Sequence, residues 1–555
     1  MQRKGLEKPL LPGRVYQLLF FLLALVAAAG LFVPLMDRDS AHHADIALHM
    51  YLTGDYTSLV DNGKDYLDKP HLHFWLCALS YKVFGVTGFA YKFPSFLFSI
   101  FGVYSTYRLG SLLYSKETGK LAALILASSF AFLLANNDVR MDAILTAAVV
   151  FSSWKLLSFI SGQKPADLVL SALGLAIGFS VKGHIGVLIP LAAAFFFILS
   201  SAQWKALLDP RWLLLIILFG LFISPVLYSY YIQYNLHPEK IVRGRSHING
   251  VRFILLEQPF ERFSGESFGG DNKRDYFFFF HTYLWAFAPW SLITVLAFAE
   301  RVKKFRSRPR EWVTPGSIIL MMLIITFSGF KLPHYLNVIF PFAAIFTAAY
   351  LVSGINDASS TNLIYRIQLI TAILFILLLS VLNGWIFPLQ SALPILILVI
   401  LLAFLFYTIK TPSFTIFQKG LMIPAATTIL VFFSLNTNFY PSLLKYQGGK
   451  QLADMIKGKV DPTEVYNWEE TYSSSFYFYT KSIRKPFSDT ILKGGNKIWL
   501  LYDKVDSDRI AAIGYKTSRI YEVPDYPITK LSLRFLDPAK RDSQCTKLVL
   551  AEIYH

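Results

Sequence analysis

The chain has 555 residues, of which 54% are hydrophobic, and its mean hydropathy is +0.46. This composition excludes an ordinary soluble domain and is typical of a protein that crosses a membrane many times. The formal net charge of +17 does not indicate a nucleic-acid partner in such a protein, because basic loops facing anionic lipid and basic residues serving an anionic substrate explain it better.

Apolar runs predict transmembrane helices, since about twenty residues at about 1.5 Å each cross about 30 Å of hydrocarbon. We expect about thirteen spans in a polytopic α-helical protein. The predicted spans are residues 15–36, 92–114, 118–136, 143–161, 166–181, 184–201, 211–231, 276–298, 313–330, 335–353, 365–386, 391–409 and 419–437. The first run lacks a small-residue cleavage site and is too long for a signal-peptide core, so we expect it to remain a span.

The distribution of Lys and Arg predicts the orientation of these spans. The N-terminal tail is basic, and the turn at 301–310 carries six basic residues. With about thirteen spans both lie on one side, which predicts a cytoplasmic N-terminus and an outer C-terminus. The loops 37–91 and 232–275 then lie outside, and their many basic residues suggest that they bind something.

The sequence changes character after residue 437. Residues 438–555 predict a helix at 449–459 and strands at 497–504 and 546–553. We therefore divide the chain into a transmembrane domain, 1–437, with periplasmic loops 37–91 and 232–275, and a small soluble periplasmic α/β domain, 438–555. The two cysteines, Cys77 and Cys545, allow at most one bridge and predict no disulfide framework.

Ionisable residues gather at the predicted outer ends of the spans, where a charge near hydrocarbon is costly. A single such residue is best explained as a helix cap at the interface. Six on one face instead indicate a site. They are Asp39, Asp68, Lys69, Asp142, Lys182 and Lys331.

These residue types suit transfer from a phosphate-linked donor. Lysine binds phosphate as a compact charge. A carboxylate acts as a base, or steadies the positive charge that develops on a sugar ring. A departing phosphate needs cationic stabilisation. The sequence thus indicates an anionic, lipid-linked substrate at the outer face.

Histidines accompany these residues. All eleven fall outside or at the interface in the predicted topology. Asp68, His42, His43 and His71 are candidate contacts for a divalent metal or for an acceptor. No spacing matches a fixed metal-ligand pattern, so ordinary hydrogen bonds explain the histidines better, and we expect no required cofactor.

The first outer loop resembles that of glycosyltransferase family 39, which includes protein O-mannosyltransferases and bacterial lipid A aminoarabinose transferases. The pieces of the pattern are Asp39, Gly54–Asp55, Asn62–Gly63, Tyr66-Leu67-Asp68-Lys69-Pro70, Trp75 and Phe84–Gly85. Further similar segments are RMDAIL (140–145), GLAIGFSVKGHIGVLIPL (174–191), FAPWSL (287–292) and KLPHYLNVIFPFAAI (331–345). The resemblance follows the first 350 residues in order, whereas the C-terminal domain matches only in position.

The resemblance implies a GT-C fold and a membrane transferase whose donor is a sugar on a polyprenyl phosphate, undecaprenyl phosphate in a bacterium. It implies that Asp39 is catalytic and that Asp142 is a second acidic position near the site. The candidate contacts for the donor phosphate are Lys69, Lys182, Arg262 and Lys331.

Three positions depart from the family pattern. Ser40 replaces a Glu that follows the catalytic Asp, and Asp68 replaces a Glu that is one methylene longer. His71 stands where a second proline is common. Because Ser40 lacks the negative charge of that Glu, the surroundings that position Asp39 differ from those in the family pattern.

We therefore expect an inverting glycosyltransferase of the inner membrane that moves a hexosyl or pentosyl group to lipid A, another glycan or a protein on the outer face. Asp39 would activate the acceptor hydroxyl or orient an acceptor phosphate. Two other classes stay open. A flippase or transporter of lipid-linked sugars would need charges inside the spans. A membrane-anchored glycan-binding module would not need so many spans. The sequence names neither the sugar nor the acceptor.

Overall fold

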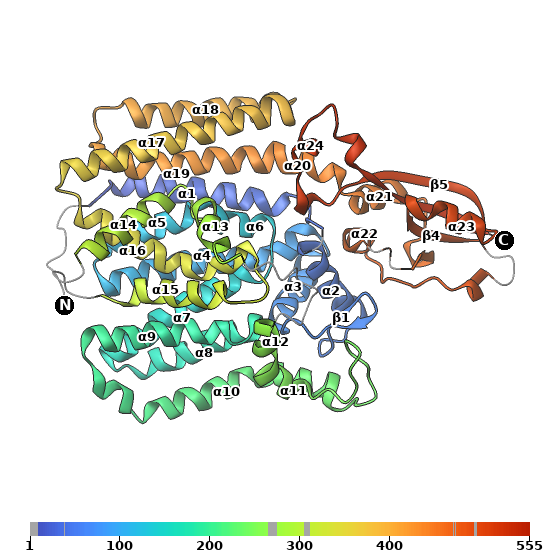
Figure 1. The fold of residues 1–555 in the computed structure, drawn as a ribbon, viewed down its shortest axis with the longest axis horizontal. Coiled ribbons are helices and arrows are strands. Elements are labelled where there is room, and N and C mark those ends of the chain that lie inside the picture. The colour runs from blue at the N-terminus through green and yellow to red at the C-terminus, as the bar shows by residue number, and fades with distance from the viewer. Residues whose placement is uncertain are drawn as a thin grey trace.

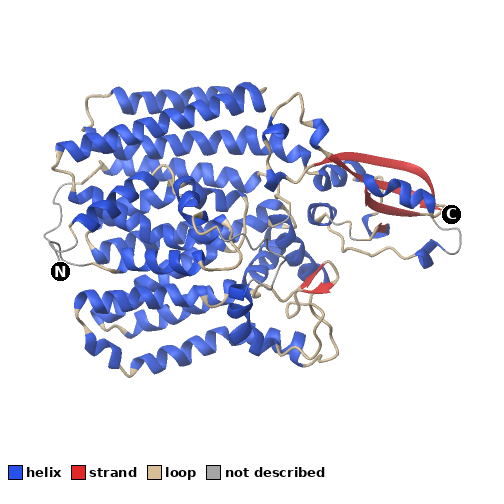
Figure 2. Ribbon diagram, in the orientation of Figure 1, coloured by secondary structure: helices blue, strands red, loops and turns tan. Residues whose placement is uncertain are grey.

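The computed structural model describes residues 9–37, 39–264, 275–304, 311–469, 471, 473–492 and 497–554. Most of the chain forms long helices that run roughly side by side (Figure 1). Figure 2 shows that the strands are confined to one end of this bundle. Helix α1 begins at the other end (Figure 1). The fold is therefore helical, with a small sheet at one end.

The helices of the bundle come from the predicted spans. They are α1 (Gly13–Ala29), α4 (Gly88–Leu113), α5 (Lys116–Ala127), α6 (Phe130–Asn137), α7 (Asp142–Gly162), α8 (Pro165–Lys182), α9 (Ile185–Ser201), α10 (Arg211–Tyr230), α13 (Phe278–Ala286), α14 (Ser291–Lys303), α15 (Val313–Thr326), α16 (Phe340–Ser353), α17 (Ala358–Val381), α18 (Ala392–Lys410) and α19 (Ile416–Ser434). A 3-10 helix, η5 (Pro333–Ile339), precedes α16.

Within the described residues, 8 helices are long and apolar enough to cross a membrane, or 9 if α5 and α6, which meet at a bend of 53°, form one broken span. Two shorter apolar helices are α9 and α15. Each predicted span coincides with a helix or a pair of helices. The polytopic helical architecture is thus confirmed, and the number thirteen stays a prediction.

Burial separates the central helices from the peripheral ones. In α7, 89% of the most apolar stretch is buried, against 17% in the long helix at Ala358–Ile386 and 22% in α18. Helices α17 and α18 lie along one edge of the bundle and α10 along the other (Figure 1). Apolar helices left open at the edges of a bundle are expected to face lipid, because lipid tails are as apolar as their side chains.

Two groups of short elements cover the end of the bundle near the sheet (Figure 1). The first comes from residues 37–91 and comprises α2 (Ser40–Thr53), β1 (Val60–Asp61), β2 (Lys64–Asp65) and α3 (Leu72–Phe84). The second comes from residues 232–275 and comprises α11 (Gly250–Arg252), a π-helical turn, η4 (Phe253–Glu257), and α12 (Gln258–Ser264). Both predicted outer loops therefore lie at the same end.

The C-terminal residues form a small mixed sheet with helices. Its elements are α20 (Tyr440–Leu443), α21 (Gly448–Ile456), β3 (Val465–Asn467), α22 (Ser474–Thr480), β4 (Ile498–Asp503), α23 (Ser507–Ala512), β5 (Lys516–Asp525), α24 (Leu533–Leu536) and β6 (Thr546–Tyr554). The strand order is β3-β4-β6-β5, with β3 and β4 parallel and the other pairs antiparallel. The predicted helix and both predicted strands are confirmed. The last helix of the bundle runs on to Tyr446, past the predicted boundary at 437.

Candidate functional site

Asp39 lies directly before α2, at the end of the bundle that the loops cover. Its side chain is 44% exposed, and its Oδ2 lies 2.9 Å from Nη1 of Arg140. Asp39 is therefore accessible and already paired with a cation that comes from another part of the chain.

Arg140 occupies the short connection between α6 and α7 and joins three groups. Besides Asp39, its Nη2 lies 2.8 Å from Oδ2 of Asp138, and its Nη1 lies 2.7 Å from Nδ1 of His334. A guanidinium group only donates, so Nδ1 of His334 accepts, and a neutral ring then carries its proton on Nε2. That Nε2 lies 3.8 Å from Oδ2 of Asp142. Although burial lowers the pKa of Arg140, the surrounding carboxylates raise it further and keep the group charged.

Asp142 and Lys182 form a buried ion pair. Nζ of Lys182 donates to Oδ1 of Asp142 at 2.6 Å, and their side chains are 3% and 8% exposed for Asp142 and Lys182. The same ammonium group lies 4.9 Å from the ring centre of Tyr335, in η5. Burying two charges is costly unless they pair, so this arrangement holds each group in a fixed place.

Glycines fix the turn that carries Lys182. Lys182 is the last residue of α8, and Gly183 follows with a φ of +72°, a backbone conformation that residues with a side chain rarely adopt. A Cβ on Gly186 would lie 2.3 Å from the backbone of Gly178, so α8 and α9 touch backbone to backbone. Close approach through small residues is a recurrent way of packing membrane helices. It places Lys182 directly beside the start of α7.

Lys69 is connected to the same turn through Asp68 and Gln258. Its Nζ pairs with the carboxylate of Asp68, which also accepts from the hydroxyl of Tyr66 at 3.4 Å. Gln258, the first residue of α12, donates to the carbonyl oxygen of Asp68 at 2.7 Å. A Cβ on Gly183 would lie 2.8 Å from Oε1 of the same Gln258. One side chain thus contacts both Asp68 and the turn that follows Lys182.

The other two candidate phosphate contacts are less closely connected. Lys331 lies three residues before His334, and its Nζ is 5.8 Å from the ring centre of Tyr276. Arg262 belongs to α12, but its side chain lies outside the described part of the chain. The structure therefore connects Asp39 to the Asp142–Lys182 pair through Arg140 and His334. It connects Lys69 to the turn after Lys182 only through Asp68 and Gln258. The roles of Arg262 and Lys331 at the phosphate stay predictions.

The histidines of the first loop have partners of their own. His42 Nε2 lies 2.9 Å from Oδ2 of Asp61. Burial lowers the pKa of His42, but the hydrogen bond and charge of Asp61 raise it more, so the net pKa lies above the usual value. Burial, together with nearby His42 and His73, holds the pKa of His43 well below its usual value. His43 is therefore a neutral core residue.

His71 is also a buried, neutral residue. Its Nε2 donates to the carbonyl oxygen of Thr57 at 2.9 Å, and burial lowers its pKa to about 4. Among the residues that the structure describes, no three His, Cys, Asp or Glu side chains are grouped to hold a metal. Asp68, His42, His43 and His71 are therefore not grouped as metal ligands in the described part of the chain, and their role as metal contacts stays a prediction. A contact of Asp68 or His42 with an acceptor stays a prediction.

Sequence reasoning gave no role to three residues that organise the site. Arg140 appears in the sequence analysis only as the first residue of the similar segment 140–145, and His334 lies 194 residues away from it in the chain. Gln258 is an uncharged residue in a loop. The similarity of the segment 331–345 to the family pattern was the one signal that pointed towards His334.

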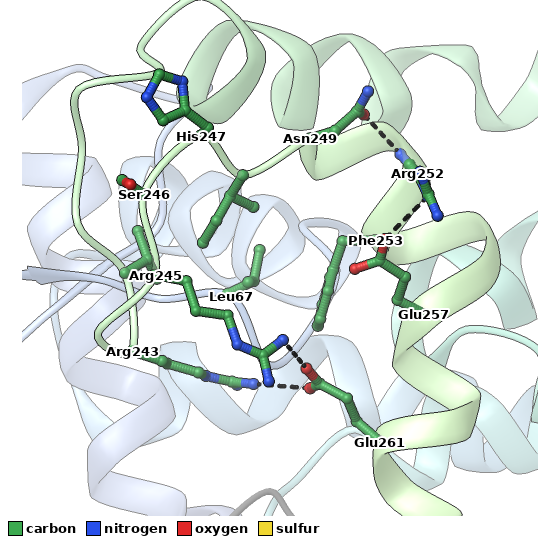
Figure 3. Close-up of a pocket in the computed structure, with 12 residues that line it drawn as sticks. Leu67, Arg243, Arg245, Ser246, His247, Asn249, Arg252, Phe253, Glu257 and Glu261 are labelled. Carbon is green, nitrogen blue, oxygen red and sulfur yellow. Dashed lines mark hydrogen bonds and ion pairs between the residues drawn. The ribbon is translucent and has the colours of Figure 1, made fainter.

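A cavity of about 550 Å³ lies between Leu67 and residues 242–261. Leu67 immediately precedes Asp68, so the cavity adjoins the site described above. Figure 3 shows charged side chains converging from the loop and from the helix across it. The charged residues of its lining are Arg243, Arg245, Arg252, Glu257 and Glu261.

A polytopic helical bundle, with paired carboxylates and lysines under the loops at one end, defines the chain as a membrane protein of GT-C type, similar to glycosyltransferase family 39. The family model described as dolichyl-phosphate-mannose-protein mannosyltransferase matches residues 68–229. ArnT from Cupriavidus metallidurans, in a structure bound to undecaprenyl phosphate, has the same fold, with a TM-score of 0.73, 15% identity and coverage of 97% of this chain and 98% of that one.

Two relatives found by sequence are informative. An uncharacterized protein of Aquifex aeolicus is 25% identical over 84% of this chain and 90% of its own length. The undecaprenyl phosphate-alpha-4-amino-4-deoxy-L-arabinose arabinosyl transferase of Pseudomonas aeruginosa strain UCBPP-PA14 is 26% identical over 57% of this chain. The match spans 55% of the length of that transferase.

Proposed function

We propose that this protein is a membrane glycosyltransferase that moves a sugar from undecaprenyl phosphate to a lipid, glycan or protein acceptor at the outer face of the inner membrane. The observation that carries the proposal is the continuous polar path from the exposed Asp39 through Arg140 and His334 to the buried Asp142–Lys182 pair. The fold shared with ArnT and the names of the relatives support the choice of donor.

Asp39 is the proposed base, because its carboxylate is the exposed end of the polar path. It takes the proton from the acceptor hydroxyl while the acceptor oxygen attacks the anomeric carbon of the sugar. The bond from that carbon to the phosphate oxygen breaks, and the lipid phosphate leaves with the electron pair. Arg140, paired with Asp39, fixes the orientation of this carboxylate and is a positioning residue.

Lys69 and Lys182 are the proposed contacts of the departing phosphate, since cations near a developing phosphate charge lower the barrier to its release. Lys182 is already paired with Asp142, so it contributes a positive charge held in place rather than a mobile one. We assign Arg262 and Lys331 to the same phosphate on the resemblance alone. No step in this account requires a metal.

The outer orientation of the site follows from the basic N-terminal tail and the basic turn at 301–310. Both outer loops, the candidate site and the C-terminal sheet lie at one end of the bundle (Figure 1). Transporters keep their binding sites near the middle of the bilayer. The gathering of the charged residues at one end therefore favours a transferase over a flippase.

The decisive test compares strains that lack the gene with strains that carry either the wild-type chain or Asp39→Asn. Mass spectrometry of lipid A, surface glycans and secreted proteins should reveal one sugar that is absent from one fraction in both the deletion and the Asp39→Asn strain. That fraction identifies the acceptor class. An unchanged sugar content in the Asp39→Asn strain would contradict the role of Asp39.

A binding measurement tests the donor site separately. Lys69→Ala should weaken binding of labelled undecaprenyl phosphate by about tenfold, the effect of losing about 1.4 kcal/mol. Lys64→Ala removes an exposed lysine from the same loop and serves as the matched control. Equal binding by both variants would remove Lys69 from the donor site.

A further inference from the structure

The proposed transfer gives no role to a lysine that is buried in the bundle. Lys92 lies near the start of α4 and is fully buried. Its Nζ donates to the carbonyl oxygens of Gly30 at 3.1 Å and of Val33 at 2.7 Å, where α1 ends. A cation is favourable there, because the last carbonyl groups of a helix lack partners and carry partial negative charge. A buried charge in a membrane protein is nevertheless costly, which indicates a function.

The residue before this lysine, Tyr91, contacts a different segment. It is also fully buried, and its hydroxyl donates to the carbonyl oxygen of Val139 at 3.0 Å. Nε2 of His73, in α3, lies 3.2 Å from the same hydroxyl oxygen. Because the hydroxyl proton is directed to Val139, the ring of His73 donates to the tyrosine oxygen. A chain of hydrogen bonds from α3 thus ends on the backbone of the residue directly before Arg140.

The segment that Lys92 contacts leads to Asp39. Further along it, the backbone N–H of Leu35 donates to the hydroxyl of Tyr479 at 2.9 Å, and Gln447 donates to the carbonyl oxygen of Leu35 at 2.9 Å. Both of these side chains come from the C-terminal part of the chain. Lys92 therefore fixes the beginning of the segment from within the bundle, and the C-terminal residues fix it nearer to Asp39.

The two segments also touch each other directly. A Cβ on Gly30 would overlap Oδ1 of Asn137, the last residue of α6. Nδ2 of Asn137 donates to Oδ1 of Asn436 at 2.6 Å, and Asn436 donates to the carbonyl oxygen of Val26, in α1, at 2.7 Å. All four residues are buried. The ends of α1 and α6 are therefore fixed against each other beneath the pair of Asp39 and Arg140.

The ion pair of Asp39 and Arg140 needs such support. The side chain of Asp39 is 44% exposed, and exposed ion pairs contribute little, because ordering two long side chains costs entropy. Successive residues of a helix point about 100° apart around its axis. Tyr91 and Lys92 therefore reach two neighbouring segments of chain at once, and each of these segments ends at one member of the pair.

We infer that Tyr91 and Lys92 are positioning residues that align Asp39 with Arg140 for the transfer step. Lys92 fixes the segment before Asp39, and Tyr91 fixes the residue before Arg140. Alignment of this kind matters for rate, since a displacement of about 1 Å can cost about 100-fold. The inference rests on the proposed function, because it takes Asp39 as the base.

Kinetics of the full-length protein in lipid nanodiscs test the inference, with the donor sugar that mass spectrometry of the deletion strain identifies. Tyr91→Phe removes one hydroxyl group and keeps the ring. Its kcat should fall about tenfold with an unchanged KM for the donor, because the contacts of the donor phosphate are not disturbed. Tyr107→Phe, in a half-buried tyrosine about 24 Å further along α4, is the matched control and should change neither constant. An unchanged kcat in Tyr91→Phe would overturn the role of Tyr91.

A double-mutant cycle separates positioning from a general loss of stability. If Tyr91 acts through Arg140, Tyr91→Phe should lower kcat less than twofold in a chain that already carries Arg140→Gln. A loss of stability alone would lower kcat by the same factor in both backgrounds. Equal factors would therefore overturn the inference.

Hydrogen–deuterium exchange reports on the turn at Asp39 without requiring transfer. The backbone N–H of His43 donates to the carbonyl oxygen of Asp39 at 3.0 Å. Lys92→Met should speed the exchange of this amide at least fivefold, because the segment before Asp39 loses its contact with α4. Lys92→Gln keeps an N–H donor and should have a smaller effect. Exchange as in the wild type for Lys92→Met would overturn the role of Lys92.

Asp39→Asn, measured in the same samples, separates this inference from the proposed function. Transfer by the wild-type chain, no transfer by Asp39→Asn and normal rates for the Tyr91 and Lys92 variants would overturn the inference and leave the proposed function standing. Absence of transfer by the wild-type chain would instead contradict the proposed function. The exchange of the His43 amide would then still decide whether Lys92 fixes the turn at Asp39.

Discussion

The buried pair of Asp142 and Lys182 shows how a charge is held in the site. Removing one partner leaves the other buried and unpaired, which is strongly destabilising, whereas removing both costs less. Lys182→Met should therefore lower the free energy of unfolding by about 3 kcal/mol, measured by thermal unfolding in nanodiscs. Adding Asp142→Asn to this variant should recover part of the loss.

An exposed pair provides the control. Lys540 pairs with Asp537 at 3.4 Å, and their side chains are 65% and 26% exposed. Lys540→Met should therefore cost less than about 1 kcal/mol. Equal losses for the two lysines would mean that Lys182 is not held as the structure places it.

The buried histidines of the first loop predict a loss of stability in acid. Burial lowers the pKa of both His71 and His73 from 6.5 to about 4, so the unfolded chain takes up protons before the folded chain does. The stabilisation is fully present above about pH 6.5 and is lost as the pH falls towards 4, by up to about 3 kcal/mol for each group.

The pH dependence of unfolding checks this expectation at a single residue. His71→Gln keeps a donor for the carbonyl oxygen of Thr57 and removes the titrating group. Its free energy of unfolding should fall less steeply than that of the wild type between pH 6.5 and 4. Parallel curves for the two proteins would show that His71 does not titrate in this range.

At the scale of elements, the contact of α8 with α9 fixes the height of Lys182 in the bundle. A methyl group on Gly186 would lie 2.3 Å from the backbone of Gly178, so the two helices would have to separate. We expect Gly186→Ala to reduce both thermal stability and sugar transfer. Gly220→Ala, in α10, meets nothing within 4 Å and should be neutral or slightly stabilising. Equal behaviour of the two variants would contradict the close contact.

A second element-scale contact ties the C-terminal sheet unit to the segment before Asp39. Oδ1 and Oδ2 of Asp37 accept hydrogen bonds from N and Oγ of Ser475, at 3.1 and 2.7 Å. Gln447 Oε1 accepts from the backbone N–H of Asp37 at 2.7 Å. The start of α22 therefore holds the chain two residues before Asp39.

Ser475→Ala tests whether the hydrogen bond from its side chain to Asp37 matters for sugar transfer. We expect kcat to fall several-fold with an unchanged KM for the donor, because Asp39 and not the phosphate site is disturbed. Ser543→Ala removes an exposed hydroxyl from the same C-terminal unit and should change neither constant. A rise in the donor KM with an unchanged kcat would count against the contact acting through Asp39.

At the scale of the whole molecule, hydropathy and charge placement predicted the helical bundle, the two loops at one end and the C-terminal α/β unit. Asp39, Asp142 and Lys182 could be proposed as site residues, because a charge at the end of an apolar span is costly and therefore indicates a function. The pairing of Arg140 with His334 could not be predicted, since the two residues are 194 positions apart and meet only through the packing of the helices. Nor could the cavity beside Leu67 be predicted, because its lining combines that residue with residues 242–261, which lie far away in the chain.

The bond between Asp37 and Ser475 spans 438 residues of chain, and it has a consequence for biosynthesis. The first loop leaves the ribosome early, but its partner is translated only after the whole bundle. Until Ser475 has been made and has reached the end of the bundle where Asp37 lies, the segment before Asp39 lacks this support. A nascent or truncated chain can therefore thread its helices into the bilayer and still lack a finished site, so activity begins only when synthesis is nearly complete.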